Sequence, residues 1–341
     1  MDILQLSKLS ERIFFINFAA VMSQRRIRLI INPISGTVGK DGIGRYVESV
    51  FGHSVEVCQT SGPGDATRLG AEAAGMGYDA VLVAGGDGTV NETAAGLCGT
   101  NVPLGIIPCG SGNGLARHLN IPVDIASSVE IARMGNIIDC DAGEVNGRPF
   151  FCTFGVGFDA AVSEKFAHQP RRGRLSYVLS VFSEYIKYNP QSYTILANGQ
   201  ELTRKAFLVA VCNASQYGNN AYIAPYASMT DGLLDVTIVH AGSPLTTALV
   251  GADLLTGLIN RNMLIHTFRT KSLSIIREEA GAAHIDGEPE ILPERMDIQC
   301  NPGRLKVFAP GAEPHFTPLI TPAHNLLRDL KLTLAHMFNE I

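Results

Sequence analysis

A short apolar run followed at once by a glycine-rich turn constrains this chain more than any other feature. Ala80–Ala84 contains two valines between an acid and a glycine pair, which is the pattern of a buried parallel strand. Gly85, Gly86 and Gly88 come next, and a helix is predicted over 89–97. Glycines at such a turn let main-chain N–H groups approach a ligand, and a helix N-terminus favours an anion. The turn therefore predicts a phosphate-binding loop at the end of a strand.

The acid inside this turn bears on the nature of the ligand. A glycine pair alone is explained equally well by an ordinary strand-to-helix turn that needs glycine for packing. Asp87 would repel a bare phosphate, so we predict that it holds Mg²⁺ or a water molecule beside one. The turn with its acid therefore favours a site for a phosphate ester and a metal ion.

Three more predicted strands, at 26–31, 54–59 and 102–107, lead into loops followed by helices. The loop residues predicted to reach a ligand are Asn32, Pro33, Ile34, Ser35 and Gly36, then Thr60, then Ser111. Asp65 is predicted to cap the helix that follows Thr60. Because strands and helices alternate through residue 135, we predict a parallel, doubly wound sheet that binds ligands at the carboxyl ends of its strands.

The pattern changes at about residue 137, where strand-like runs separated by Asn-Gly, Asp-Gly and Pro-Gly turns predict antiparallel pairing. The runs lie at 140–145, 149–156, 193–197, 206–212, 234–239, 273–276, 296–300 and 305–308, with helices predicted at 176–188 and 244–258. We therefore predict two domains, over 25–136 and 137–310. An extension at 1–24 precedes them, and a helical segment at 311–341 is expected to pack back on the body.

Composition narrows the functional classes. The 341-residue chain is 46% apolar and 17% charged, which suits a globular protein of two domains. A net charge of −5 argues against a nucleic-acid partner, which normally requires a basic surface. The seven cysteines include no CxxC pair, so neither a disulfide framework nor a zinc site is predicted. A reducing cytoplasm is expected.

Both ends of the chain carry apolar segments. The run at 13–22 is about half of the ~20 residues that span a bilayer, and Glu11 before it disfavours a signal peptide. It is interpreted as a packed helix or as an extension upstream of a start at Met22, with an interfacial membrane helix as the third alternative. A C-terminal stripe is predicted to be docked core, with a membrane contact as the alternative; it comprises Leu326, Leu327, Leu330, Leu334 and Phe338.

The segment GGDGTVNE at 85–92 resembles the nucleotide-binding motif of the diacylglycerol kinase catalytic domain family, which includes bacterial soluble lipid kinases, sphingosine kinases and ceramide kinases. Other segments resemble motifs of this family and follow in its order. They are NPISG at 32–36, the segment beginning at Thr60, PCGSGNG at 108–114, GVGFDA at 155–160 and DGE at 286–288. The resemblance covers nearly everything from about 26 to 310.

The resemblance implies an α/β domain similar to those of NAD kinases and phosphofructokinases, a C-terminal antiparallel β-sandwich, and an active site in the cleft between them. It also implies ATP and Mg²⁺ as cofactors. The residues expected at the nucleotide are Asn32, Pro33, Ile34, Ser35, Gly36, Thr60, Gly85, Gly86, Asp87, Gly88, Thr89, Val90, Asn91 and Ser111.

The resemblance places further roles in the second domain. Mg²⁺ is expected at Asp231 with the backbone carbonyls of Ser228 and Leu233, although Asp231-Gly232 is most simply a tight turn. Asp159 is expected on the lipid side of the cleft, with a helix cap as the alternative. Glu288 is expected to accept the proton of the lipid hydroxyl. Asp286 is predicted to support it by holding Mg²⁺ or its water shell, since positions two apart in an extended chain share a face.

These features predict an ATP-dependent lipid kinase acting on diacylglycerol or a sphingoid base. The alternatives are an NAD kinase, which shares the GGDG core, and a non-enzymatic lipid-binding protein on the same scaffold. The expected partner is a lipid at a membrane surface, reached from the cytoplasmic side by peripheral contact, and a homodimer is left open. The basic cluster at 171–174 is either a solvated loop or a contact with anionic headgroups.

Overall fold

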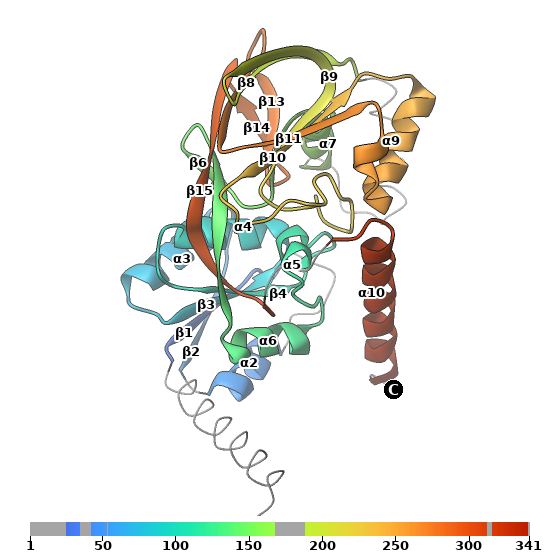
Figure 1. Ribbon diagram of the computed structural model, residues 1–341. Helices are drawn as coiled ribbons and strands as arrows, with labels where there is room; N and C mark the ends of the chain where they lie inside the picture. The colour runs from blue at the N-terminus through green and yellow to red at the C-terminus, as the bar shows by residue number, and fades with distance from the viewer. Residues whose placement is uncertain (1–24, 35–41, 53, 168–187, 312–315, 340–341) are drawn as a thin grey trace, which may run out of the picture.

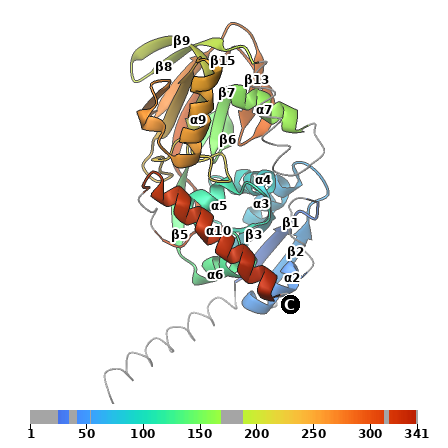
Figure 2. The ribbon, with the colours of Figure 1, turned by 90° about the vertical axis from the view of Figure 1, so that its right-hand side faces the viewer.

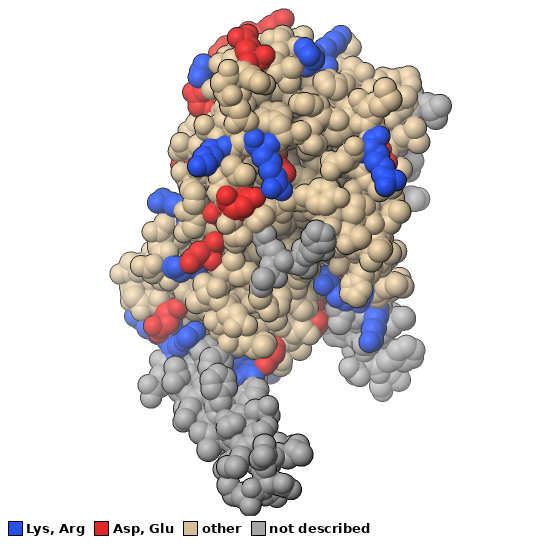
Figure 3. Space-filling view, viewed as in Figure 1, with Lys and Arg blue, Asp and Glu red and all other residues tan. Residues whose placement is uncertain are grey.

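The computed structural model describes residues 25–34, 42–52, 54–167, 188–311 and 316–339. Figure 1 shows an α/β half below a half built from strands, with the C-terminal helix beside the α/β half, and Figure 3 shows acidic and basic side chains interspersed on the same face. Several predictions lie outside the described residues: the apolar run at 13–22, the helix at 176–188 except for its last residue, the basic cluster at 171–174, and Ser35 and Gly36.

The α/β half is built on four parallel strands. They are adjacent in the order β2 (Val55–Gln59), β1 (Ile27–Ile31), β3 (Ala80–Gly85) and β4 (Leu104–Pro108). Every residue of β1, β3 and β4 is buried, as expected for parallel strands covered on both faces. The predicted doubly wound sheet is confirmed.

Helices cover both faces of this sheet because successive residues of a strand point to opposite sides. Val81 and Val83 of β3 belong to the core that includes α3 (Asp65–Gly75) and α4 (Asp87–Leu97). Leu82 of the same strand lies in the opposite core with α2 (Ile43–Phe51) and α6 (Ile125–Met134). A short helix, α5 (Gly114–His118), follows β4.

The β half consists of antiparallel pairs, as predicted. Its strands are β5 (Ile137–Val145), β6 (Arg148–Phe150), β7 (Thr153–Gly157), β8 (Gln191–Ala197), β9 (Gln200–Cys212), β10 (Leu234–His240), β11 (Ile265–Thr270), β12 (Ser272–Ile276), β13 (Gly281–Ile285), β14 (Glu288–Leu292) and β15 (Arg295–Phe308). The order β14-β13-β7-β9-β8-β12-β15 runs through this half, and β10 joins β9 to β11. Two helices, α7 (Phe158–Ala167) and α9 (Pro244–Thr256), decorate it (Figure 1).

Two long strands tie the halves together. β5 leaves the α/β half and pairs antiparallel with β15, which returns to it. At its end, Val307 pairs parallel with Leu104 of β4, so β15 also extends the nucleotide-side sheet. The sequence predicts two separate strands at 296–300 and 305–308, whereas the structure has one strand whose register shifts between Asn301 and Leu305. The Pro302-Gly303 pair interrupts the ladder there without ending the strand.

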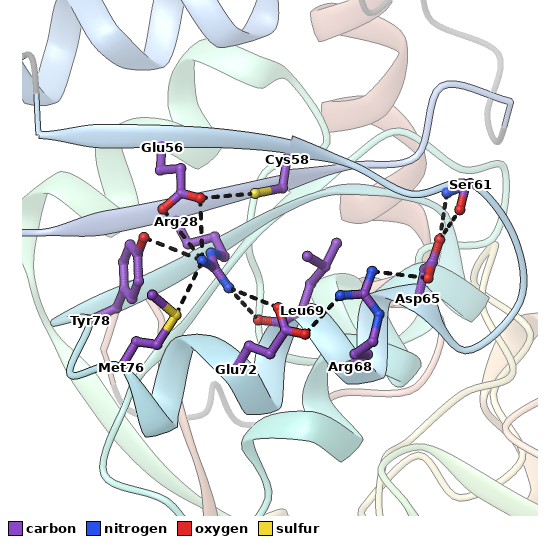
Figure 4. Close-up of polar contacts among 10 residues, drawn as sticks. All are labelled: Arg28, Glu56, Cys58, Ser61, Asp65, Arg68, Leu69, Glu72, Met76 and Tyr78. Carbon is purple, nitrogen blue, oxygen red and sulfur yellow. Dashed lines mark hydrogen bonds and ion pairs between the residues drawn. The ribbon is translucent and has the colours of Figure 1, made fainter.

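A buried arginine stabilises the α/β half near the amino ends of β1 and β2. Arg28 is 4% exposed, and its guanidinium donates to the carbonyl of Leu69 at 3.2 Å and pairs with Glu56 at 3.3 Å (Figure 4). It also lies over the ring of Tyr78, 4.5 Å from the centroid. A buried charge is tolerated only when it is paired and hydrogen-bonded, so these contacts fix α3 against β1 and β2.

Candidate active site

Parallel pairing brings four loop starts to one edge of the α/β sheet. Asn32 donates its N–H to the carbonyl of Ala84 at 3.2 Å, and Thr60 donates to Ile31 at 3.0 Å. Cys109, which follows β4, donates to Gly85 at 2.8 Å. The loops predicted from separate strands are therefore adjacent at the carboxyl edge, where open α/β sheets bind ligands.

The glycine-rich loops after β3 and β4 touch through their backbones. A Cβ atom on Gly110 would lie 2.7 Å from the Cα of Gly86, a distance that side-chain carbons do not adopt. Asn113 holds the second loop closed, since its side chain accepts from the N–H of Gly110 at 3.0 Å and donates to the carbonyl of Gly110 at 2.7 Å. Ser111 is exposed at the tip. The first N–H groups of α4, which have no acceptor within the helix, follow Gly86 directly.

Asp87 does not occupy the position predicted for it. Its two carboxylate oxygens accept the backbone N–H groups of Asn113 at 2.9 Å and Gly114 at 2.6 Å, at the start of α5. Burial raises the pKa of Asp87, and these hydrogen bonds oppose that rise. The carboxylate therefore joins the two glycine-rich loops, and the expectation that it holds Mg²⁺ or a water beside a phosphate is corrected.

The other residues predicted at the nucleotide differ in how far their side chains are exposed. Pro33 and Ile34 are exposed beside the site, and the Asn32 side chain donates to Thr89 Oγ1 at 3.0 Å. Val90 is wrong as a nucleotide contact, because its side chain lies in the core and its N–H donates to the carbonyl of Gly86.

Glu92 is a residue that the sequence reasoning missed, although it closes the GGDGTVNE segment. Its carboxylate accepts the N–H groups of Gly64 at 3.0 Å and Ala66 at 3.2 Å, so it caps α3 from a neighbouring helix. Asp65, the predicted cap, is instead the first residue of α3 and accepts from the N–H of Ser61 at 2.7 Å (Figure 4). Two acids thus fix the loop that carries Thr60.

The DGE segment forms a two-residue hairpin between β13 and β14. Asp286 and Gly287 have φ values of 52° and 85°, as a type I′ turn requires. Asp286 therefore does not share a face with Glu288. Its buried carboxylate accepts three backbone N–H groups, at 2.7 to 2.9 Å, from Phe151, Cys152 and Thr153. The prediction that Asp286 holds Mg²⁺ is corrected: it anchors the turn that carries Glu288.

Glu288 points from the β half to the glycine-rich turn of the α/β half. Its Oε1 lies 2.9 Å from the position that a Cβ atom on Gly88 would take, so a side chain at Gly88 would move the carboxylate from this position. The side chain of Asn91 donates to the carbonyl of Asp286 at 3.5 Å and connects α4 to the same hairpin. An exposed carboxylate thus lies beside the predicted phosphate loop, as a proton acceptor for a bound hydroxyl must.

The anchoring of Asp286 predicts a specific pH dependence. Burial raises the pKa of Asp286 from 3.8 to about 6. Between these pH values the folded protein binds a proton that the unfolded chain has released, so the contribution of Asp286 to stability is largest below about pH 4 and falls as pH rises to about 6. The free energy of unfolding of the parent, relative to Asp286→Asn, should fall by on the order of 2 to 3 kcal/mol across this window. Urea unfolding of the parent and of Asp286→Asn at several pH values measures this difference. The same pH dependence of the free energy of unfolding in both proteins would contradict the prediction.

Asp159 lies in a buried polar cluster that the sequence did not reveal. Its Oδ2 accepts from the hydroxyl of Tyr217 at 3.0 Å and is 3.2 Å from Nε2 of His284. The N–H of Gly287 donates to Nδ1 of His284 at 3.3 Å, so this nitrogen is an acceptor and Nε2 carries the proton. Asp159 is thereby connected to the DGE hairpin through His284, and its contact with a lipid stays a prediction.

The carboxylate predicted for Mg²⁺ is paired with a cationic side chain. Asp231 accepts from the N–H of Leu233 at 3.0 Å through one oxygen, and its other oxygen pairs with Nη1 of Arg269 at 3.3 Å. The same guanidinium pairs with Asp235 at 3.1 Å and donates to the carbonyl of Tyr226. Arg269 thus supplies a positive charge to both carboxylates, and Mg²⁺ at Asp231 with the carbonyls of Ser228 and Leu233 stays a prediction.

This arrangement predicts an exchange between arginine and metal. Arg269→Ala should destabilise the protein by roughly 1 to 2 kcal/mol, because two carboxylates lose their shared cation. Millimolar Mg²⁺ should then raise the melting temperature of the variant more than that of the parent. Arg269→Lys, which keeps the charge without the forked geometry, is the matched control. An equal response of parent and variant to Mg²⁺ would contradict the prediction.

Concavity alone does not mark the site. An open groove of about 740 Å³ lies on the outer hairpins of the β half. Its lining residues include Glu144, Asn198, Glu201 and Asp297 and none of the loop residues described above. The site is therefore identified by its convergent glycine loops and by Glu288.

Glycine loops on a parallel sheet, with a carboxylate delivered from an antiparallel half, define the class as a two-domain phosphotransferase. Residues 26–145 match the family model "Diacylglycerol kinase catalytic domain", and residues 152–309 match "YegS C-terminal NAD kinase beta sandwich-like domain". The chain belongs to the diacylglycerol kinase catalytic family and is a lipid kinase.

Individual relatives agree with this assignment. The chain is 31% identical over 236 residues to a diacylglycerol kinase of Mycobacterium tuberculosis, covering 64% of this chain and 74% of that protein. It is 30% identical over 276 residues to a diacylglycerol kinase of Bacillus subtilis, covering 77% and 90%. A crystal structure of a putative diacylglycerol kinase from Bacillus anthracis has the same fold, with a TM-score of 0.69 at 24% identity over 84% of this chain and 97% of that one.

Proposed function

We propose that this kinase transfers the γ-phosphate of ATP to the hydroxyl group of diacylglycerol in a membrane. The observation that carries the proposal is the position of Glu288 Oε1, beside Gly88 of the turn that begins α4. A carboxylate at this point can reach a hydroxyl that faces a phosphate bound on the same turn. The relatives named diacylglycerol kinase favour this acceptor over a sphingoid base.

The chain's own residues support each part of the transfer. The phosphates of ATP are expected over Asn32, over Gly85 to Thr89 and over the loop of Ser111, where backbone N–H groups stabilise negative charge. Mg²⁺ bound with the nucleotide neutralises charge on these phosphates. Glu288 accepts the proton of the lipid hydroxyl as the hydroxyl oxygen forms a bond to the γ-phosphorus. The bond from that phosphorus to the bridging oxygen breaks, and ADP leaves.

A transfer assay tests the proposal. Labelled ATP is incubated with the full chain and with diacylglycerol, sphingosine, ceramide or NAD, each with Mg²⁺ or with EDTA. Label is expected in the diacylglycerol product only when Mg²⁺ is present, and not with Glu288→Gln. Transfer to a sphingoid base or ceramide would replace the proposed substrate. Transfer to NAD would overturn the proposal.

A further inference from the structure

The C-terminal helix α10 (Ile320–Asn339) docks on the body through polar side chains. Asn325 is 5% exposed and donates to the hydroxyl of Tyr222 at 2.7 Å. Asp329, the only acid of this helix, pairs with the buried guanidinium of Arg117. These contacts fix one face of α10 against the molecule, although a docked helix ordinarily packs an apolar face.

Over residues 320–331, the part of α10 whose side chains the structure describes, the opposite face is apolar and exposed. Leu326, Leu327 and Leu330 are 57%, 67% and 52% exposed, and Ile320 at the start of the helix is 67% exposed. Their spacing of three and four residues places the leucines on one side of the helix. The prediction that this stripe is docked core is therefore wrong for the three leucines. Exposed apolar groups gathered on one helix face mark an interaction surface.

We propose that α10 docks the kinase on an anionic lipid bilayer, with its outer leucines inserted among the headgroups. The proposal rests on the proposed function in one respect, since a lipid acceptor must be reached in a membrane. A bilayer with anionic headgroups fits the basic side chains of α10 as well as its exposed apolar side chains. A helix that lies in the interface plane has an apolar face flanked by basic residues.

Charge on α10 favours a bilayer over a second copy of the chain. His324 and Lys331 are exposed beside the leucines. Arg328 lies instead toward the docked side, where its Nε is 3.8 Å from Oδ1 of Asp329. The one acid, Asp329, is directed to the docked side. A two-fold interface through this face would bring the basic groups of two copies together, whereas each basic group near an anionic bilayer contributes about 1 kcal/mol.

The position of α10 would connect docking to the active site. Figure 2 shows α10 crossing the α/β half on the same side as α9, whose Leu249 and Leu255 are also exposed. Arg117, which holds α10 through Asp329, donates Nε–H to the carbonyl of Gly112 at 2.9 Å. This carbonyl lies in the loop of Ser111. Docking through α10 would therefore fix the nucleotide loops relative to the membrane surface.

Sedimentation of the full chain with vesicles tests the proposal, without ATP or kinase substrate. The parent should bind vesicles of phosphatidylcholine with phosphatidylglycerol better than vesicles of phosphatidylcholine alone. A triple variant, Leu326→Glu with Leu327→Glu and Leu330→Glu, should bind the anionic vesicles about tenfold or more weakly. Lys331→Gln should weaken binding about fivefold. The matched control replaces Met134 and Ile137, two exposed apolar residues elsewhere, by Glu and should bind as the parent does.

Each result decides for or against the proposal. Circular dichroism and the rate on detergent-solubilised lipid should be the same for the triple variant and the parent, so that lost vesicle binding is not unfolding. Parental binding by the triple variant would overturn the proposal. The proposal would also be overturned if light scattering showed that the parent is a dimer and the triple variant a monomer, while the variant still bound vesicles. Loss of binding on deletion of residues 1–21, but not in the triple variant, would assign it to the N-terminal segment. Intact vesicle binding with failed phosphate transfer would reject the proposed function alone.

Discussion

Glu288→Gln is expected to lower kcat by about 10² to 10⁴, the usual contribution of a general base. The amide keeps the shape of the side chain beside Gly88 but cannot accept the proton of the attacking hydroxyl. Because Glu288 is exposed at the start of β14, the fold and the affinity for ATP should not change. Single-turnover rates and nucleotide titration measure the two quantities separately.

Glu290→Gln is the matched control for this change. Glu290 lies two residues along the same strand, and its carboxylate pairs with Arg148 instead of approaching the glycine-rich turn. The control should keep most of the parental rate. Gly88→Ala is a second probe, since its Cβ would meet Oε1 of Glu288 and displace the carboxylate without a change in charge. A parental rate in Glu288→Gln would reject the assignment of the base.

Gly86→Val is expected to reduce kcat/KM for ATP by on the order of 10² or more, because branched carbons would enter the space between the two glycine-rich loops and displace the phosphates. The backbone of Gly86 is extended, with φ −88°, so valine is not strained there. A Cβ at this position would meet the Cα of Gly110 at 3.5 Å, which is ordinary contact. The variant should therefore fold.

Gly86→Ala separates steric exclusion from loss of folding. It adds only the Cβ and should keep a melting temperature near that of the parent with a smaller loss of ATP affinity. Calorimetric titration with ATP and Mg²⁺ measures the series from glycine to alanine to valine. Unchanged ATP affinity in folded Gly86→Val would show that the phosphates do not lie on this turn.

The local pattern of apolar residues and turn residues was sufficient to predict the parallel architecture of one half and the antiparallel architecture of the other. The run Ala80–Gly85 is buried throughout and ends at the predicted glycine, because a strand covered on both faces needs apolar residues at every position. The antiparallel half was predicted from its turn dipeptides, although β11, β13 and β14 were missed. β13 and β14 contain polar or small residues such as Gly281, His284 and Glu290, so their apolar signal is weak.

The apparent break in β15 shows why strand boundaries are harder to predict. A Pro-Gly pair ordinarily ends a strand, but β5 continues to pair on both sides of it. The partner strand lies more than 150 residues earlier in the chain, so no local window contains the pairing that keeps β15 continuous.

The sequence by itself determined the class of fold and the loops that form the site, since both depend on periodicity and on glycines near one another along the chain. Only the tertiary structure decided what the acids do. Asp286 accepts N–H groups from a segment up to 135 residues away, and Asp87 and Glu92 cap helices other than their own. The outward face of α10 was decided in the same way, because Asn325 and Asp329 found buried polar partners on distant elements. Hydrogen-bond partners are chosen by proximity in space, and residue type alone does not reveal which groups will be near.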